Sequence, residues 1–126
     1  MSIKFLVPSL LISAMAFSQT SVSGYVFEDL NKNNKKENRE RGVENVAVSN
    51  GAQVVLTDKN GKYSLPIQQD QTIFVIKPSG FKLPLNSNNL PQYYYQYKPK
   101  GSPEDFKYKG VLPTGALPMD IIFALE

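Results

Sequence analysis

Short segments with alternating hydrophobic and polar residues follow one another along the chain from residue 21 onward. The pattern predicts β-strands at residues 21–28, 43–49, 52–57, 62–67, 72–77 and 119–125. Between them, Asn50-Gly51 predicts a two-residue hairpin, because both residues accept a positive φ, and the sequence DKNG at 58–61 predicts another turn. No helical periodicity appears after residue 19. The sequence therefore predicts an all-β fold, a single immunoglobulin-like or prealbumin-like β-sandwich of about seven strands.

The apolar positions of these strands predict the hydrophobic core, because one face of each strand must pack on the opposing sheet. We expect ten side chains to be mostly buried: Val26, Val46, Val48, Val55, Tyr63, Leu65, Phe74, Ile76, Ile122 and Leu125.

The stretch from Phe81 to Pro118 has many prolines and few clean strand patterns, so it predicts a long ordered excursion from the sandwich. It contains the run Tyr93-Tyr94-Tyr95-Gln96-Tyr97. This run is open to three interpretations: alternate tyrosines that pack on the sandwich, a contact with another domain, or a stacking platform for a sugar or a base. If a partner domain covers the run, part of it should be exposed in this chain.

The N-terminus has the organisation of a secretory signal peptide. Lys4 precedes an apolar run, Phe5 to Phe17, which ends on Ala16-Phe17-Ser18 with small residues at the two positions that a signal peptidase reads. The run is too short for a membrane-spanning helix, which needs roughly 20 residues. We therefore expect a signal peptide at residues 1–18, a domain at residues 19–126, and a secreted, periplasmic or cell-surface location without a membrane span.

Composition removes several classes of function. The chain has no His and no Cys, so it lacks the usual general base, the commonest transition-metal ligand and any disulfide. It has 14 Lys and Arg against 11 Asp and Glu, without a basic stripe interleaved with aromatics, so nucleic acid is not an expected partner. We expect no catalysis by this chain and no catalytic residues in it; its oligomeric state is left open.

The segment from Asp29 to Glu40 has the ligand spacing of a calcium loop. With Asp29 as position 1, oxygen-bearing side chains fall at positions 1, 3, 5, 9 and 12, and position 7 offers a backbone carbonyl. The residue at position 6, usually Gly, is Asn34, which tolerates a positive φ. The alternative is an exposed polar loop without an ion. The predicted Ca²⁺ ligands are Asp29, Asn31, Asn33, Lys35 through its carbonyl, Glu37 and Glu40.

Three long segments resemble the N-terminal domain of secreted bacterial calcineurin-like metallophosphoesterases: Gly24 to Pro66, Ile73 to Pro103 and Tyr108 to Pro118. The Asp-x-Asn-x-Asn loop and the run from Thr57 to Tyr63 also resemble calcium-binding B-repeats of adhesins and carboxypeptidase regulatory-like domains. All of these families have sandwich folds. In the phosphoesterase family, a catalytic domain with Asp, His and Asn ligands for two metal ions follows this module.

The resemblance implies a non-catalytic accessory module whose partner is a phosphoesterase catalytic domain, either as part of a truncated enzyme or as a free-standing copy. Two other functions stay open. One is a structural or adhesion module of the cell surface that calcium makes rigid, and the other is a carbohydrate-binding module that uses the tyrosine run.

Overall fold

The computed structural model describes residues 20–103, 107 and 110–126, and the expected signal peptide at 1–18 lies outside this range. The described part of the chain contains seven strands and no helix. It therefore has no helix that is long and apolar enough to span a bilayer. The strands are β1 (Ser21–Glu28), β2 (Ala47–Ser49), β3 (Val54–Leu56), β4 (Lys62–Pro66), β5 (Gln71–Ile76), β6 (Tyr94–Tyr97) and β7 (Phe123–Leu125). The six strands predicted from the sequence are all present, several of them shorter than expected.

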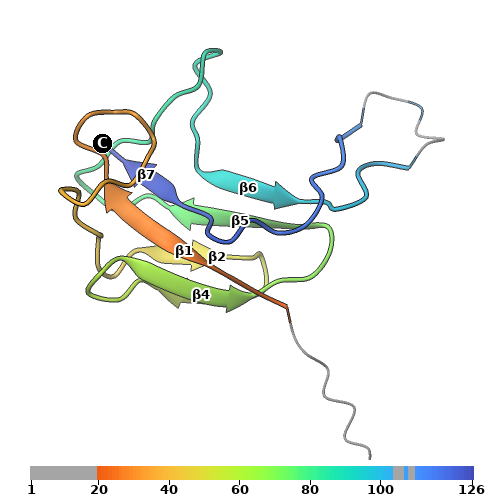
Figure 1. Ribbon diagram of the computed structural model, residues 1–126, viewed down its shortest axis with the longest axis horizontal. Helices are drawn as coiled ribbons and strands as arrows, with labels where there is room; N and C mark the ends of the chain where they lie inside the picture. The colour runs from red at the N-terminus through yellow and green to blue at the C-terminus, as the bar shows by residue number, and fades with distance from the viewer. Residues whose placement is uncertain (1–19, 104–106, 108–109) are drawn as a thin grey trace, which may run out of the picture.

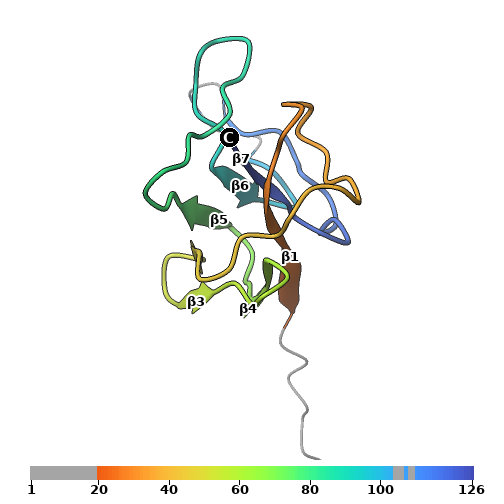
Figure 2. The ribbon, with the colours of Figure 1, turned by 90° about the vertical axis from the view of Figure 1, so that its left-hand side faces the viewer.

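The strands form two sheets, which Figures 1 and 2 show as the two layers of a sandwich. One sheet has the order β4-β1-β7 and the other β3-β2-β5-β6. All neighbouring strands are antiparallel except β1 and β7, which run parallel, with Val26 opposite Phe123. The prediction of an all-β sandwich of about seven strands is therefore confirmed.

The core lies between the sheets and contains six of the ten predicted residues. Val55 and Phe74 are only partly buried, and the predictions for Ile76 and Ile122 are wrong, because these side chains are 49% and 38% exposed. In β5 the core contains Ile73 and Val75, which lie on the face opposite to Ile76. Next to β7 it contains Ile121 and Phe123, on either side of the exposed Ile122. The runs IFVI and MDIIFAL have apolar residues on both faces, so alternation could not fix which face is buried. Six predicted residues are fully buried: Val26, Val46, Val48, Tyr63, Leu65 and Leu125.

The connection between β2 and β3 differs from the predicted two-residue hairpin. Ser49 pairs with Val54, so four residues separate the strands, and of the Asn50-Gly51 pair only Gly51 has a positive φ, 90°. The buried Asn50 side chain holds the loop instead. Its Oδ1 accepts hydrogen bonds from the N–H groups of Ala52 (2.9 Å) and Gln53 (2.7 Å), and its Nδ2 donates to the Pro66 carbonyl (2.7 Å).

All of the tyrosine run except Tyr93 forms strand β6, at the edge of the four-stranded sheet, in a stretch with few clean strand patterns in its sequence. Tyr95 and Tyr97 pack against the core, whereas Tyr93 and Tyr94 are exposed and their rings contact edge to face at 5.1 Å. Alternate tyrosines therefore pack on the sandwich, as one of the three interpretations expected. Part of the run is exposed, which a partner domain would also require.

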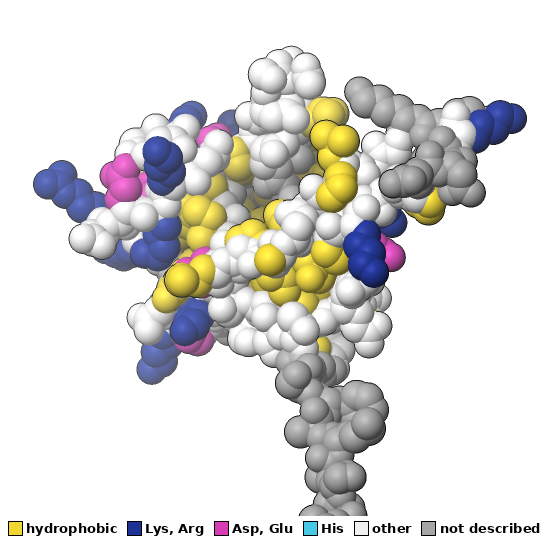
Figure 3. Space-filling model, turned by 45° about the vertical axis from the view of Figure 1, so that its right-hand side comes forward, with side chains coloured by type: hydrophobic (Ala, Val, Ile, Leu, Met, Phe, Trp, Pro, Cys, Tyr) yellow, Lys and Arg dark blue, Asp and Glu magenta, His cyan; other side chains and the backbone are white. Residues whose placement is uncertain are grey.

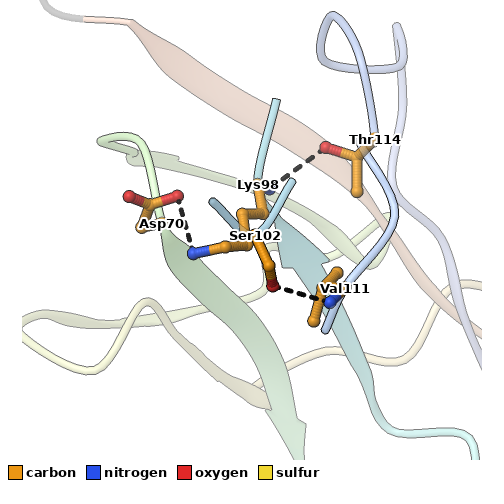
Figure 4. A network of polar contacts seen from close by, with 5 residues as sticks. All are labelled: Asp70, Lys98, Ser102, Val111 and Thr114. Carbon is orange, nitrogen blue, oxygen red and sulfur yellow. Dashed lines mark hydrogen bonds and ion pairs between the residues drawn. The ribbon is translucent and has the colours of Figure 1, made fainter. Parts of the chain in front are cut away.

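The excursion after β6 is closed at its base by hydrogen bonds between segments far apart in sequence (Figure 4). The Lys98 N–H donates to Thr114 Oγ1 at 3.0 Å, and the Val111 N–H donates to Ser102 Oγ at 2.7 Å. The Lys98 ammonium also pairs with Asp70 at 3.4 Å, which ties the excursion to the turn before β5. These contacts join the described residues on the two sides of the excursion to each other and to the sheet.

Candidate functional site

The predicted calcium loop follows β1 directly and lies at the end of the sandwich where β7 ends (Figure 1). The Glu28 N–H donates to the Arg41 carbonyl at 2.9 Å, which closes the base of the loop. The Asp29 N–H donates to the Leu125 carbonyl at 2.8 Å. The first predicted ligand is therefore fixed to the last strand of the fold.

Asp29 is the most unusual residue of the loop, because it is a carboxylate with only 2% of its surface exposed. Its Oδ2 accepts a hydrogen bond from the Asn34 N–H at 2.7 Å. Its Oδ1 is buried and, alone among buried side-chain polar atoms in the described residues, has no hydrogen-bond partner. Burying a carboxylate oxygen without a partner is costly, so this atom lacks the donor or cation that would offset its loss of solvation.

Asn34 adopts a φ of 58°, as its place at position 6 predicted. This conformation is rare for residues other than Gly, and Asn is one of the few that accept it at low cost. It directs the Asn34 N–H at Asp29, and the loop turns back on itself there. Lys32 also has a positive φ, 57°, which the sequence did not indicate.

Glu40, at position 12, is 5% exposed and joins both ends of the loop. Its Oε2 accepts from the Leu30 N–H and its Oε1 from the Glu37 N–H, each at 2.9 Å. These charge-assisted bonds hold the carboxylate in place. The two ends of the predicted ligand set, Asp29 and Glu40, are thus the buried members of the loop, and the residues between them are exposed.

The middle ligands gather around Glu37. The side-chain amides of Asn31 and Asn33 donate to Glu37 Oε1 at 3.1 and 2.6 Å. Their Oδ1 atoms accept from backbone N–H groups two residues on, that of Asn33 at 3.4 Å and that of Lys35 at 3.0 Å. Among the described residues, no group of three or more His, Cys, Asp or Glu side chains is placed to hold a metal ion. Each of the three loop carboxylates instead accepts at least one N–H bond, although Asp29 Oδ1 accepts none.

A second feature, missed by sequence reasoning, is the outer face of the four-stranded sheet. We name it the apolar face and define it by Ala47, Val54, Leu56, Phe74, Ile76 and Tyr94. Val54, Leu56 and Tyr94 are 55–62% exposed. Cross-strand pairing arranges these residues in two rows across the sheet. One row is Leu56–Ala47–Ile76, and the other is Val54–Ser49–Phe74–Tyr94, which includes the polar Ser49.

The other sheet provides a contrast. Its outward positions on β1 and β4 include Ser23, Tyr25, Lys62 and Ser64, so polar side chains predominate there, as is normal for the solvated face of an antiparallel sheet. The apolar face carries no charge. The only indication in the sequence was that strands such as VVL and IFVI lack polar residues at alternate positions.

Comparison with protein families matches residues 30–111 to the family described as the N terminal of Calcineurin-like phosphoesterase. The same comparisons find no match among curated proteins and none among solved structures. The match includes most of the calcium-like loop, strands β2 to β6 and most of the excursion, and no catalytic phosphoesterase domain is detected in the chain. Because the matched region is more than half of the 126 residues, the chain belongs to the family of N-terminal domains of calcineurin-like phosphoesterases.

Proposed function

We propose that this protein is a non-catalytic accessory module of an exported calcineurin-like metallophosphoesterase, and that its loop from Asp29 to Glu40 binds Ca²⁺. The module acts as part of the enzyme or as a free-standing copy. The family match supports the accessory role. The observation that carries the calcium site is the Asp29 carboxylate, 2% exposed, with an Oδ1 that lacks a partner.

The residues of the loop fit a calcium ion in their chemistry. Carboxylate, amide and carbonyl oxygens are the ligands that Ca²⁺ prefers, and a flexible loop suits it better than Mg²⁺, which demands tighter octahedral geometry. Asp29 and Glu40 would hold the ion from the buried ends of the loop. Asn31 and Asn33 would offer their side-chain amide oxygens, which accept backbone N–H bonds in this structure. Glu37 and the Lys35 carbonyl complete the proposed set.

The ion would supply charge neutralisation and order rather than chemistry on a substrate. Three carboxylates within twelve residues repel one another, and the loop between Glu28 and Arg41 buries little apolar surface of its own. An exported module works where calcium is abundant, so a weak site, with a dissociation constant on the order of 10⁻⁴–10⁻³ M, would be filled. Export itself rests on the proposed signal peptide at residues 1–18.

The apolar face is the proposed contact with the catalytic domain. It spans about 20 Å across four strands and about 15 Å along them, roughly 300 Å². A stable dimer of free chains needs about 800 Å² per partner. Interfaces between domains of one chain are smaller, and a tethered partner gains from its high effective concentration. A covalently linked domain therefore fits this face better than a second copy does.

Thermal melts of the full chain, in EDTA and in about 5 mM Ca²⁺, test the calcium site. Binding to the folded state alone should add about 1–2 kcal/mol, which raises Tm by several degrees. Asp29→Ala and Glu40→Ala should each abolish the rise. Asp58→Ala is the matched control, because Asp58 also accepts backbone N–H bonds, from Asn60 and Lys62, but lies outside the loop. If the wild type melts at the same temperature in both buffers, the loop is an exposed polar loop that binds no ion.

The accessory role is tested separately by reading the gene sequence beyond the codon for Glu126. Coding sequence for Asp-x-His and Gly-Asn-His motifs downstream of Glu126 would support it. Tandem copies of the Asp-x-Asn-x-Asn loop would instead favour a calcium-stiffened surface spacer. Glycan binding by the chain that is lost in Tyr94→Ala would favour a carbohydrate-binding module.

A further inference from the structure

A polar hollow lies beside the loop and shares Lys36 and Glu40 with it, and the proposed function assigns no ligand to this hollow. Its volume is about 520 Å³, and we name it the basic hollow. Tyr25 on β1 forms one wall, and two loops distant in sequence form the rest. Its lining residues are Tyr25, Lys36, Glu40, Arg41, Gly42, Lys59 and Asn60.

Two glycines bring these loops together. A Cβ atom at Gly42 would lie 1.8 Å from the Asn60 carbonyl oxygen, and one at Gly61 would lie 2.6 Å from the Gly42 Cα. The contact is possible only because both side chains are missing, and Gly61 also has a positive φ of 75°. The neighbours of these glycines, Arg41 and Lys59, are consequently placed around the same hollow.

Three of the residues that line the hollow are cationic: Lys36, Arg41 and Lys59. Within the described residues none of them forms an ion pair, since the ion pair found there joins Lys98 and Asp70. The Lys36 ammonium lies 5.6 Å from the centre of the Tyr25 ring and 3.5 Å from the Glu40 carbonyl oxygen. Figure 3 shows Lys and Arg side chains along the left-hand side of the molecule, with Asp and Glu side chains among them.

The one carboxylate in the lining, that of Glu40, offsets only one of these three positive charges. Both oxygens of Glu40 already accept backbone N–H bonds inside the loop, and the residue is buried. Like charges gathered around a hollow raise its positive potential and attract anions. The lining therefore keeps a net positive charge, which an anionic ligand would complement.

We propose that the basic hollow binds a phosphate group carried by an organic ester. A phosphate ester has up to two negative charges and three acceptor oxygens, which suits three cations better than a single carboxylate does. The Arg41 guanidinium can bind two of these oxygens as a fork, and the two lysines act as point charges. The Tyr25 ring provides an apolar wall for the carbon part of the ester. The proposal requires neither calcium nor a catalytic domain.

A titration of the full ¹⁵N-labelled chain with glycerol 3-phosphate, followed by NMR in EDTA at constant ionic strength, tests the proposal. Saturable shifts are expected for the amides of Tyr25, Gly42 and Asn60. Arg41→Gln and Lys59→Gln should each weaken binding by about tenfold, as expected for loss of one charged hydrogen bond. All three cationic residues are exposed, so the variants should keep the wild-type spectrum elsewhere.

Lys77→Gln is the matched control, because it removes the same charge from an exposed lysine outside the hollow. Its affinity should stay that of the wild type. Phosphatidylcholine vesicles with and without phosphatidic acid separate a lipid headgroup from a soluble ester as the source of the phosphate. The proposal is overturned if neither glycerol 3-phosphate nor the phosphatidic acid vesicles bind, or if Lys77→Gln weakens binding as much as Arg41→Gln does.

Discussion

Replacement of Tyr63 by Phe probes the contact that joins the two outer strands of the three-stranded sheet. Tyr63 on β4 is 2% exposed, and its ring lies 6.1 Å from that of Phe123. Its hydroxyl donates a 2.6 Å hydrogen bond to the Ile121 carbonyl, just before β7. The bond passes over Gly24 on β1, which is the Cα partner of Tyr63. A Cβ at Gly24 would lie 1.7 Å from the same carbonyl oxygen, so only Gly permits this approach.

The Tyr63→Phe change keeps the ring and removes only the hydroxyl group. The Ile121 carbonyl then loses its donor in a buried setting, which typically costs about 1–3 kcal/mol. A domain of this size has a total stability of roughly 5–15 kcal/mol, so the loss should be easily measured.

The same hydroxyl predicts a dependence on pH. Burial raises the pKa of Tyr63 above its ordinary value of 10.0, and the negative charge of Asp120 raises the pKa further. The folded state therefore holds this proton more tightly than the unfolded state does. Its stabilising effect is fully present below about pH 10 and is lost as the pH rises beyond that value. Tyr63→Phe lacks the group, so its stability should fall less steeply in alkali.

Urea denaturation of both proteins, followed by circular dichroism at about pH 7 and about pH 11, measures both effects. The stability gap between wild type and Tyr63→Phe should be largest at neutral pH and shrink in alkali. Taking the difference cancels the titration of the other tyrosines and the lysines. Equal stabilities at neutral pH, or a gap that does not change with pH, would refute the reasoning.

Two further predictions follow from the buried faces. Ile73→Ala should lower the free energy of unfolding by about 2–5 kcal/mol, because Ile73 is 0% exposed, whereas Ile76→Ala should lower it much less, because Ile76 is 49% exposed. Chemical denaturation measures both values, and a larger loss for Ile76→Ala would contradict the observed face of β5. Gly24→Ala should destabilise by more than about 3 kcal/mol, because the new methyl group meets backbone that cannot move aside, and a melting temperature near that of the wild type would show that β7 can shift.

Much of the fold could be read from local sequence. The all-β class and six of the seven strands follow from short alternating segments and from turn residues, both of which are set by a few neighbours along the chain. The loop from Asp29 to Glu40 belongs here too. Its spacing and the positive φ of Asn34 are properties of twelve consecutive residues, although whether it takes calcium stays a prediction.

Only the tertiary structure decided which face of β5 is buried and that the tyrosine run is an edge strand. A segment such as IFVI is apolar on both sides, so burial is settled by the sheet it faces and not by its own pattern. The burial of Asp29 and the basic hollow likewise depend on contacts across the fold, such as Asp29 with Leu125 and Gly42 with Asn60. Sequence spacing carries no information on such contacts, because they arise from the packing of segments that are distant in the chain.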